Sequence, residues 1–173
     1  EEYPGKVEPY IDEIAKLLND NFGSARGHAA RALESIVGKF PEKVEPYVDE
    51  ICRSTVRLCG SARGHAALAL GRIAVEFPEE ADPYVDEVAE LLNDDYGLAR
   101  ANAAGALGSI AGEFPEKVEP YVDGLAELLN DNFGSARGNA ALALGSIAGE
   151  FPEKVEPYID NIGILLNEND GLF

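Results

Sequence analysis

The sequence repeats itself with a period of 37 residues. Residues 77–113 and 114–150 carry the same amino acid at 27 of 37 positions. Two sets of residues keep this phase without an insertion: prolines at 4, 41, 78, 115 and 152, and glycines at 23, 60, 97, 134 and 171. A period between 20 and 50 residues is typical of stacked-repeat proteins. The 173 residues therefore predict one elongated domain, 1–173, made of repeats 3–39, 40–76, 77–113 and 114–150 and a partial repeat 151–173.

Each unit predicts two helices. In repeat 114–150, Val118, Leu125 and Leu129 share one face of a helix expected at about 117–130. A cluster of Asn, Asp and Gly then predicts a turn. A second helix is expected at about 135–149, where Gly149 and the following Phe-Pro end it. The prediction is an all-α protein, a right-handed α-solenoid of about four and a half two-helix repeats.

The phrase PYVDELAELLNDDxGxARxNAAxALGxIA resembles the HEAT-like repeats of the HEAT/armadillo superfamily. The resemblance covers the whole chain and implies that the second helices line a concave face where partners bind. It also implies a ladder between an Asp late in the first helix and an Arg early in the second. The matching positions are Asp20, Asp94 and Asp131, and Arg26, Arg63, Arg100 and Arg137. Repeat two has Arg57 in place of the Asp, which puts the ladder in doubt there.

The period of 37 residues is shorter than the 40 to 47 usual for this class, so we expect short turns. It leaves no room for the additional short helix of armadillo repeats unless the PEKV stretch forms one. Arg137 also follows from the helical wheel, because it lies on the apolar side of its helix. A charge directed inward needs acceptors. We therefore assign the arginines a structural role.

The side of the second helix away from the expected core is nearly bare. In repeat four it carries Gly138, Leu142, Gly145 and Gly149. Each glycine inside a helix costs about 1 kcal/mol relative to Ala, which stability alone does not explain. One interpretation is a shallow groove that binds a partner segment. Its positions are Arg31, Leu68, Gly105 and Leu142, with Glu34 and Arg72 nearby. The other is packing against a second copy or against the rest of a longer superhelix.

A polar row flanks that groove, made of His28, His65, Asn102 and Asn139. It resembles the asparagine ladder with which armadillo-type repeats hold the main chain of an extended peptide. The alternative is that these side chains are solvated or bonded to a neighbouring turn. His28 and His65 would lie one repeat apart, roughly 9 to 10 Å. Two ligands of one zinc ion each lie ~2 Å from the metal, so we predict no metal site.

The net charge of −18 limits the classes of partner. Phosphate binding needs a Lys/Arg footprint, so we expect neither nucleic acid nor an anionic membrane surface as a ligand. The acidic surface fits a protein or peptide of basic character, or serves solubility alone. Self-association through exposed terminal repeats stays open. Because the chain starts at Glu1 and stops after the first helix of a repeat, we expect a fragment of a longer array.

No catalytic motif stands out. The sequence has no GxSxG, no phosphate-binding GxxxxGK[ST] and no HExxH, and its carboxylates lie on polar helix faces. We predict a protein-binding scaffold that is not an enzyme and needs no cofactor. The resemblance keeps one enzymatic alternative, a bilin-lyase-like HEAT repeat protein, and the near-identical units keep another, an artificial consensus array without a natural ligand. Two cysteines make no disulfide framework and favour a reducing, cytoplasmic compartment.

Repeat two breaks the pattern between Cys52 and Cys59. Ser54 and Thr55 stand in place of two core leucines, and Arg57 and the nearby Arg53 form a basic patch. One interpretation is a specialised contact for an acidic element of a partner. The other is an accident of the gene, a compensated pair of frameshifts within CRSTVRLC.

Overall fold

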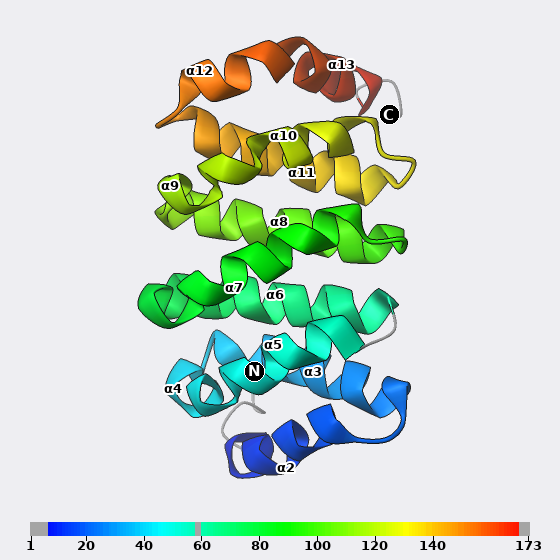
Figure 1. Cartoon of the computed structure of the whole chain (residues 1–173), viewed down its shortest axis with the longest axis vertical. Helices are drawn as coiled ribbons and strands as arrows, with labels where there is room; N and C mark the ends of the chain where they lie inside the picture. The colour runs from blue at the N-terminus through cyan, green and yellow to red at the C-terminus, as the bar shows by residue number, and fades with distance from the viewer. Residues whose placement is uncertain (1–6, 58–59, 170–173) are drawn as a thin grey trace.

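The computed structural model describes residues 7–57 and 60–169, and every element assigned in these ranges is a helix. The repeats are stacked along the long axis of the molecule, from the first repeat at one end to α13 (Ile159–Asn169) at the other (Figure 1). The all-α repeat fold predicted from the 37-residue period is confirmed.

The second helix of each repeat is continuous. It starts at the glycine that marks the phase of the repeat; in repeats one, three and four this glycine follows an aromatic residue with extended backbone, such as Phe133 (φ −95°, ψ 112°). It ends before a second aromatic residue, and the Phe114 N–H donates to the Ile110 carbonyl at 2.7 Å. These four helices are α3 (Gly23–Val37), α6 (Gly60–Glu76), α8 (Gly97–Glu113) and α11 (Gly134–Ala148).

The first helix of a repeat is broken, which differs from the single helix predicted at 117–130. In repeat four it is divided into α9 (Pro115–Val118), η5 (Glu119–Tyr121), α10 (Val122–Glu127) and η6 (Leu128–Asn130). Pro120 has no N–H and cannot continue the α-helical hydrogen bonds, so the chain tightens into a 3₁₀ turn there. The PEKV stretch forms the short additional helix that the period left in doubt.

The other first helices vary this plan, most clearly in repeat three. There α7 (Pro78–Glu90) passes through its second proline as one helix before η4 (Leu91–Asn93). The remaining segments are η1 (Glu8–Tyr10), α2 (Ile11–Lys16), η2 (Leu17–Asn19), α4 (Pro41–Val44), η3 (Glu45–Tyr47), α5 (Val48–Arg57), α12 (Pro152–Val155) and η7 (Glu156–Tyr158). In addition, α5 and α13 stay α-helical where repeat four has η6.

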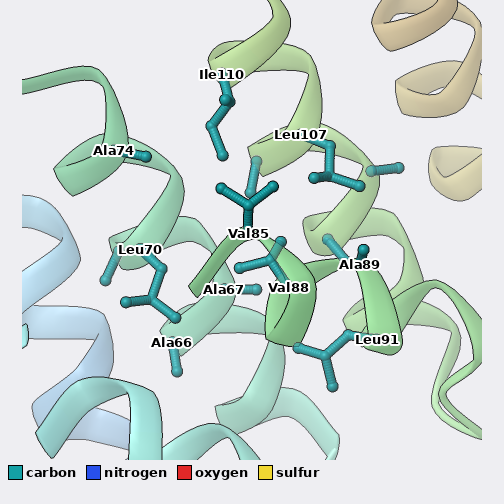
Figure 2. Close-up of a cluster of buried hydrophobic side chains, with 14 of the residues drawn as sticks. Ala66, Ala67, Leu70, Ala74, Val85, Val88, Ala89, Leu91, Leu107 and Ile110 are labelled. Atoms are coloured by element: carbon teal, nitrogen blue, oxygen red, sulfur yellow. The ribbon is translucent and has the colours of Figure 1, made fainter. Parts of the chain in front are cut away.

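Figure 1 shows the two sets of helices as two layers of one stack. The second helices contact one another along the stack, α3 with α6, α6 with α8 and α8 with α11. Between the layers lies the core, where Leu70 of α6, Val88 of α7 and Leu107 of α8 meet (Figure 2). Such side chains are fully buried or nearly so, and each contributes roughly 1.5–3 kcal/mol. The phenylalanines between repeats, Phe114 among them, lie half-buried against this core.

Candidate partner-binding face

The outer row of the second-helix layer consists of one residue from each helix: Arg31, Leu68, Gly105 and Leu142. Arg31 is exposed, Leu68 and Gly105 are half-buried, and 72% of Leu142 is exposed. The Cδ2 atom of Leu68 lies 3.9 Å from the position that a Cβ atom on Gly105 would take. Leu68 therefore covers part of the glycine and makes an apolar strip from α6 to α8.

The serines one turn further along the second helices add no free donors to this strip. Ser35, Ser109 and Ser146 each donate their hydroxyl hydrogen to the carbonyl four residues earlier, at 3.0, 3.1 and 3.3 Å. Repeat two instead carries Arg72, whose guanidinium lies 3.2 Å from the Glu34 carboxylate. The position one turn beyond the outer row is therefore charged in α6, where Arg72 reaches back to α3, and is an internally bonded serine in α3, α8 and α11.

The polar row predicted to contact a partner lies between consecutive second helices. The Asn139 amide donates to the Ala101 carbonyl of α8 at 2.7 Å, so the structure uses this side chain to join repeats three and four. Asn102 lies close to Gly64, with its Nδ2 2.9 Å from the position that a Cβ there would take. The alternative of a bond to a neighbouring repeat therefore describes Asn139, and the assignment of Asn102 to the partner-binding set stays a prediction.

The two histidines of that row differ from each other. His28 is exposed on α3. His65 is half-buried, and its Nδ1 has no hydrogen-bond partner among the described residues. Burial, together with the positive charge of Arg31, lowers the pKa of His65 below its ordinary value. His65 is therefore held neutral against α3 rather than presented to a ligand.

In repeats two and three, the glycines equivalent to the predicted groove residue Gly145 face the next repeat in the interior of the stack. A Cβ atom on Gly71 would lie 2.6 Å from the Cβ of Ala106 and 2.8 Å from its Cα, so only glycine fits there. A Cβ atom on Gly108 would lie 3.4 Å from the same atoms of Ala143. Close approach of adjacent second helices therefore explains Gly71, whereas a Cβ at Gly108 would make an ordinary van der Waals contact. In repeat four, a Cβ on Gly145 would meet nothing within 4 Å.

The Arg–Asp ladder joins repeats two to four. Arg63 donates to the Asp94 carboxylate at 2.5 and 2.7 Å, and Arg100 donates to the Asp131 carboxylate at 2.6 and 2.8 Å. Each arginine thus pairs with the Asp of the following repeat in the two-pronged geometry that makes such pairs strong. The hydrogen bond from Arg100 holds the pKa of Asp131 below its ordinary value, although burial opposes this.

The ladder arginines also close the turn of their own repeat. The guanidinium groups of Arg26, Arg100 and Arg137 donate to the backbone carbonyls of Asp20, Asp94 and Asp131 at 2.7, 2.7 and 2.9 Å. The Asp131 carboxylate in turn accepts the Phe133 N–H at 2.7 Å, just before α11 begins. One Arg and one Asp per repeat therefore fix the turn and connect it to the next repeat.

Sequence reasoning missed a second ladder on the first-helix layer. The hydroxyl groups of Tyr47 and Tyr158 donate to Asp12 and Asp123 of the preceding repeat at 2.8 and 2.7 Å. Tyr84 and Tyr121 make the same bond to Asp49 and Asp86. The signal was present as a Tyr-x-Asp triplet in every repeat, but the pairing of Tyr with the previous Asp exists only once the repeats are stacked.

The irregular part of repeat two lies mostly outside the described residues. Cys59 and the side chains of Cys52 and Arg57 belong to this part, so its two interpretations stay predictions. Arg53, which the structure does describe, is exposed. It lines a cavity of about 590 Å³ together with Arg26, Asp20 and Glu50. The charges of this cavity are mixed, so it does not make a purely basic site.

Two further findings concern metals and membranes. Within residues 7–57 and 60–169, no three His, Cys, Asp or Glu side chains are grouped closely enough to hold a metal ion. In the same part of the chain, no helix combines the length and the apolar character needed to cross a membrane.

The sequence matches no family model and no curated protein. The structure, by contrast, is similar to solved repeat proteins. The HEAT-repeat karyopherin Kap121p, solved as the mutant D353K/E396K/D438K, matches over 95% of this chain and 18% of its own length, with a TM-score of 0.74 and 20% identity. The chain has the HEAT-like repeat fold. Two structures described as engineered proteins also share this HEAT-like fold, targets OR366 and OR329 of the Northeast Structural Genomics Consortium. Their TM-scores are 0.70 and 0.68 and their identities 24% and 26%, and the alignments cover 87% and 89% of this chain and 69% and 68% of theirs.

Proposed function

We propose that this HEAT-like repeat protein is a scaffold that binds a protein or peptide segment across the outer row of its second helices. The observation that carries the proposal is the apolar strip of Leu68, Gly105 and Leu142 on an otherwise strongly acidic chain. A strip of this kind, open to solvent on a layer one helix thick, supports binding of a helix or an extended segment.

The charge distribution supports a partner with basic flanks. The chain carries 32 acidic residues against 14 basic ones. Complementary charge raises association rates and excludes acidic competitors. The partner we propose therefore has an apolar centre that contacts Leu68 and Leu142, with lysine or arginine on both sides. The Arg72–Glu34 pair at one end of the row would set the register.

A displayed peptide library tests the proposal. Selection on the wild-type chain should enrich peptides with apolar centres and basic flanks. The double variant Leu68→Glu/Leu142→Glu should lose them, because two charges would then lie under the apolar centre. The matched control is Leu17→Glu/Phe22→Glu, which places the same two charges on exposed apolar residues elsewhere and should leave binding unchanged. Equal binding by both double variants would contradict the proposal.

The same experiment separates the alternatives. An artificial array without a ligand, the alternative suggested by near-identical units, would enrich no selective peptide. Two structural neighbours are engineered proteins, which is a statement about those proteins. The bilin-lyase alternative has its own readout, because co-expression with a bilin supply would give a coloured product. Our proposal for the chain is binding without catalysis, in the cytoplasm.

A further inference from the structure

An open cavity lies between the first helices of repeats three and four, away from both ends of the described stack. Its volume is about 440 Å³, and α7 and η4 form one wall of it while η5 and α10 form the other. Figure 1 shows α10 following α7 along the first-helix layer. The cavity therefore lies on the opposite side of the core from the outer row of the second helices.

Gly124 leaves room in this cavity that a longer polar side chain takes in the other repeats. Those residues are Glu13, Glu50, Glu87 and Asn161. Between repeats one and two, the Asn19 amide donates to the Glu50 carboxylate and so joins the two first helices. Asn93 is the equivalent of Asn19 in repeat three, and it lines the cavity together with Gly124. The cavity therefore includes the place that a side chain of the following repeat takes at the first junction.

The floor of the cavity is apolar, and its two walls are joined. Ala89 and Leu92 of the first wall are 7% and 4% exposed. The Leu92 Cδ1 atom lies 3.2 Å from the position that a Cβ atom on Gly124 would take, so the leucine lies against the glycine. Tyr121 lines the other wall, and its hydroxyl donates to the Asp86 carboxylate of the first. An apolar floor with a few fixed polar groups is the usual composition of a binding cavity.

The sequence around the cavity carries only negative charge. Residues 84–95 contain five Asp or Glu and residues 118–131 contain four, one of each set being a ladder residue, and neither segment contains Lys or Arg. The exposed carboxylates of Asp86 and Glu90 line the cavity one helical turn apart. Burial, the hydrogen bond to Asp86 and the charges of nearby carboxylates together raise the pKa of Tyr121 to about 12, so the negative field reaches the cavity wall. Such a field attracts cations and repels anions.

The shape of the cavity narrows the kind of cation. A bare ion would leave the apolar floor uncovered, whereas the methylene groups of an arginine side chain would cover Ala89 and Leu92. Asp86 and Glu90 are four residues apart on one helix, which places their Cβ atoms about 5–6 Å from each other. A planar guanidinium can donate to both carboxylates at once and lie on the Tyr121 ring, which the compact ammonium of lysine does less well.

We propose that this cavity binds the side chain of an arginine that a partner protein supplies. A side chain fits the place better than a free small molecule, because at the first junction Glu50 enters the equivalent place from a neighbouring backbone. The partner's backbone then stays outside, over the exposed carboxylates of Asp86 and Glu90.

Nuclear magnetic resonance of the whole isotope-labelled chain tests the proposal. The probe is the blocked peptide acetyl-Gly-Gly-Arg-Gly-Gly-amide, whose only charge is the guanidinium. Its titration should shift the amide signals of Leu92, Tyr121 and Gly124 along one saturable curve. The same peptide with citrulline, which keeps the shape of arginine without its charge, should bind about tenfold more weakly. The lysine peptide should bind about threefold more weakly than the arginine peptide.

Variants of the chain locate the site. Gly124→Gln places in the cavity a side chain as long as that of Glu50 and should weaken binding of the arginine peptide by about tenfold or more. Glu90→Gln removes one carboxylate and should weaken it by about threefold. The matched controls are Gly112→Gln and Glu113→Gln, at two exposed residues of α8. Both controls should bind the peptide as the wild type does, and circular dichroism should show that all four variants are folded.

Several outcomes would overturn the proposal. One is the absence of a saturable shift at Gly124 with the arginine peptide. Equal binding of the citrulline peptide would show that charge is not recognised, and equal binding of the lysine peptide would show that the guanidinium is not. Unchanged binding by Gly124→Gln would place the peptide elsewhere on the chain. Tighter binding of free butylguanidinium than of the peptide would make a small molecule the ligand.

The outer row does not enter this test. Leu68→Glu/Leu142→Glu changes the second-helix layer and should bind the arginine peptide as the wild type does. Gly124→Gln should in turn leave unchanged the selection of peptides with apolar centres. Failure of one proposal can therefore be told from failure of the other.

Discussion

The two helix layers hold the same repeat in place by different means. Second helices approach so closely that glycine is needed, as at Gly71 against Ala106, and shape decides the contact. First helices are broken by prolines and are connected by tyrosine hydroxyls, such as Tyr121 donating to Asp86. The comparison shows that the stacking of 37-residue repeats is stabilised by close packing in the second-helix layer and by hydrogen bonds in the first-helix layer. The five predictions below test this difference.

The largest effect on the free energy of unfolding is expected at the Arg–Asp ladder, which joins successive repeats. Asp131→Ala removes the carboxylate that pairs with Arg100 and also accepts the Phe133 N–H. The Arg100 side chain is 15% exposed, so its charge would be left buried and poorly compensated. We expect a loss of roughly 3 kcal/mol in the free energy of unfolding, measured by urea denaturation. The control is Asp95→Ala, an exposed carboxylate in the same kind of turn, which should change stability by about 0.5 kcal/mol or less.

The Arg100–Asp131 ion pair should also make the free energy of unfolding depend on pH. Because pairing with Arg100 lowers the pKa of Asp131 in the folded state, its contribution is fully present above the ordinary Asp value of about 3.8. It is lost as the pH falls from that value through the folded pKa. The stability difference between the wild type and Asp131→Ala should therefore shrink below about pH 4. A difference that does not change with pH would contradict the assigned ion pair.

Close packing of the second-helix layer predicts that alanine substitution at two equivalent glycines changes the free energy of unfolding in opposite directions. Gly71→Ala should lower the free energy of unfolding by roughly 1–3 kcal/mol, because the new Cβ overlaps Ala106. Gly145→Ala, at the same repeat position but with nothing within 4 Å, should raise it by up to about 1 kcal/mol through helix propensity. Thermal and urea denaturation of both variants check this. Two changes of the same sign would show that packing does not require the glycine.

The first-helix layer should respond less to a single change. Tyr121→Phe removes one hydroxyl that donates to Asp86 and should cost about 1 kcal/mol in the free energy of unfolding. Tyr10→Phe is the matched control, because Tyr10 is 61% exposed and its hydroxyl bonds to no other described residue. It should leave stability unchanged within about 0.5 kcal/mol. An equal loss in both variants would show that the effect does not come from the hydrogen bond to Asp86.

The smallest effect is the alkaline titration of the same bond. Burial, together with the hydrogen bond to Asp86, raises the pKa of Tyr121 to about 12. A tyrosine in the unfolded chain titrates near pH 10. Its contribution is therefore fully present below about pH 10 and is lost as the pH rises towards 12. The stability difference between the wild type and Tyr121→Phe should narrow over that range. A constant difference would mean that the hydroxyl is not bonded in the folded state.

The helical wheel predicted much of the candidate site, and there is a physical reason for the positions that it assigned wrongly. The wheel placed Leu68, Gly105 and Leu142 on one outer row, as the structure does. It also placed Asn139 in a row beside it that was open to a partner, because a wheel shows angles around one helix and contains no neighbouring helix. Once α8 and α11 pack together, Asn139 turns to the Ala101 carbonyl and Gly108 faces Ala143. The Tyr–Asp ladder was invisible for the same reason.

The sequence by itself determined the period, the helical character of each unit and the places where the second helices begin and end, while the resemblance to HEAT-like repeats supplied the Arg and Asp ladder. These depend on local backbone chemistry and on spacing that an insertion would destroy. The tertiary structure alone decided which glycines are buried, which polar side chains are used inside the stack, and which apolar side chains stay exposed at its end. Those properties belong to pairs of repeats, and a pair exists only after the helices have come together.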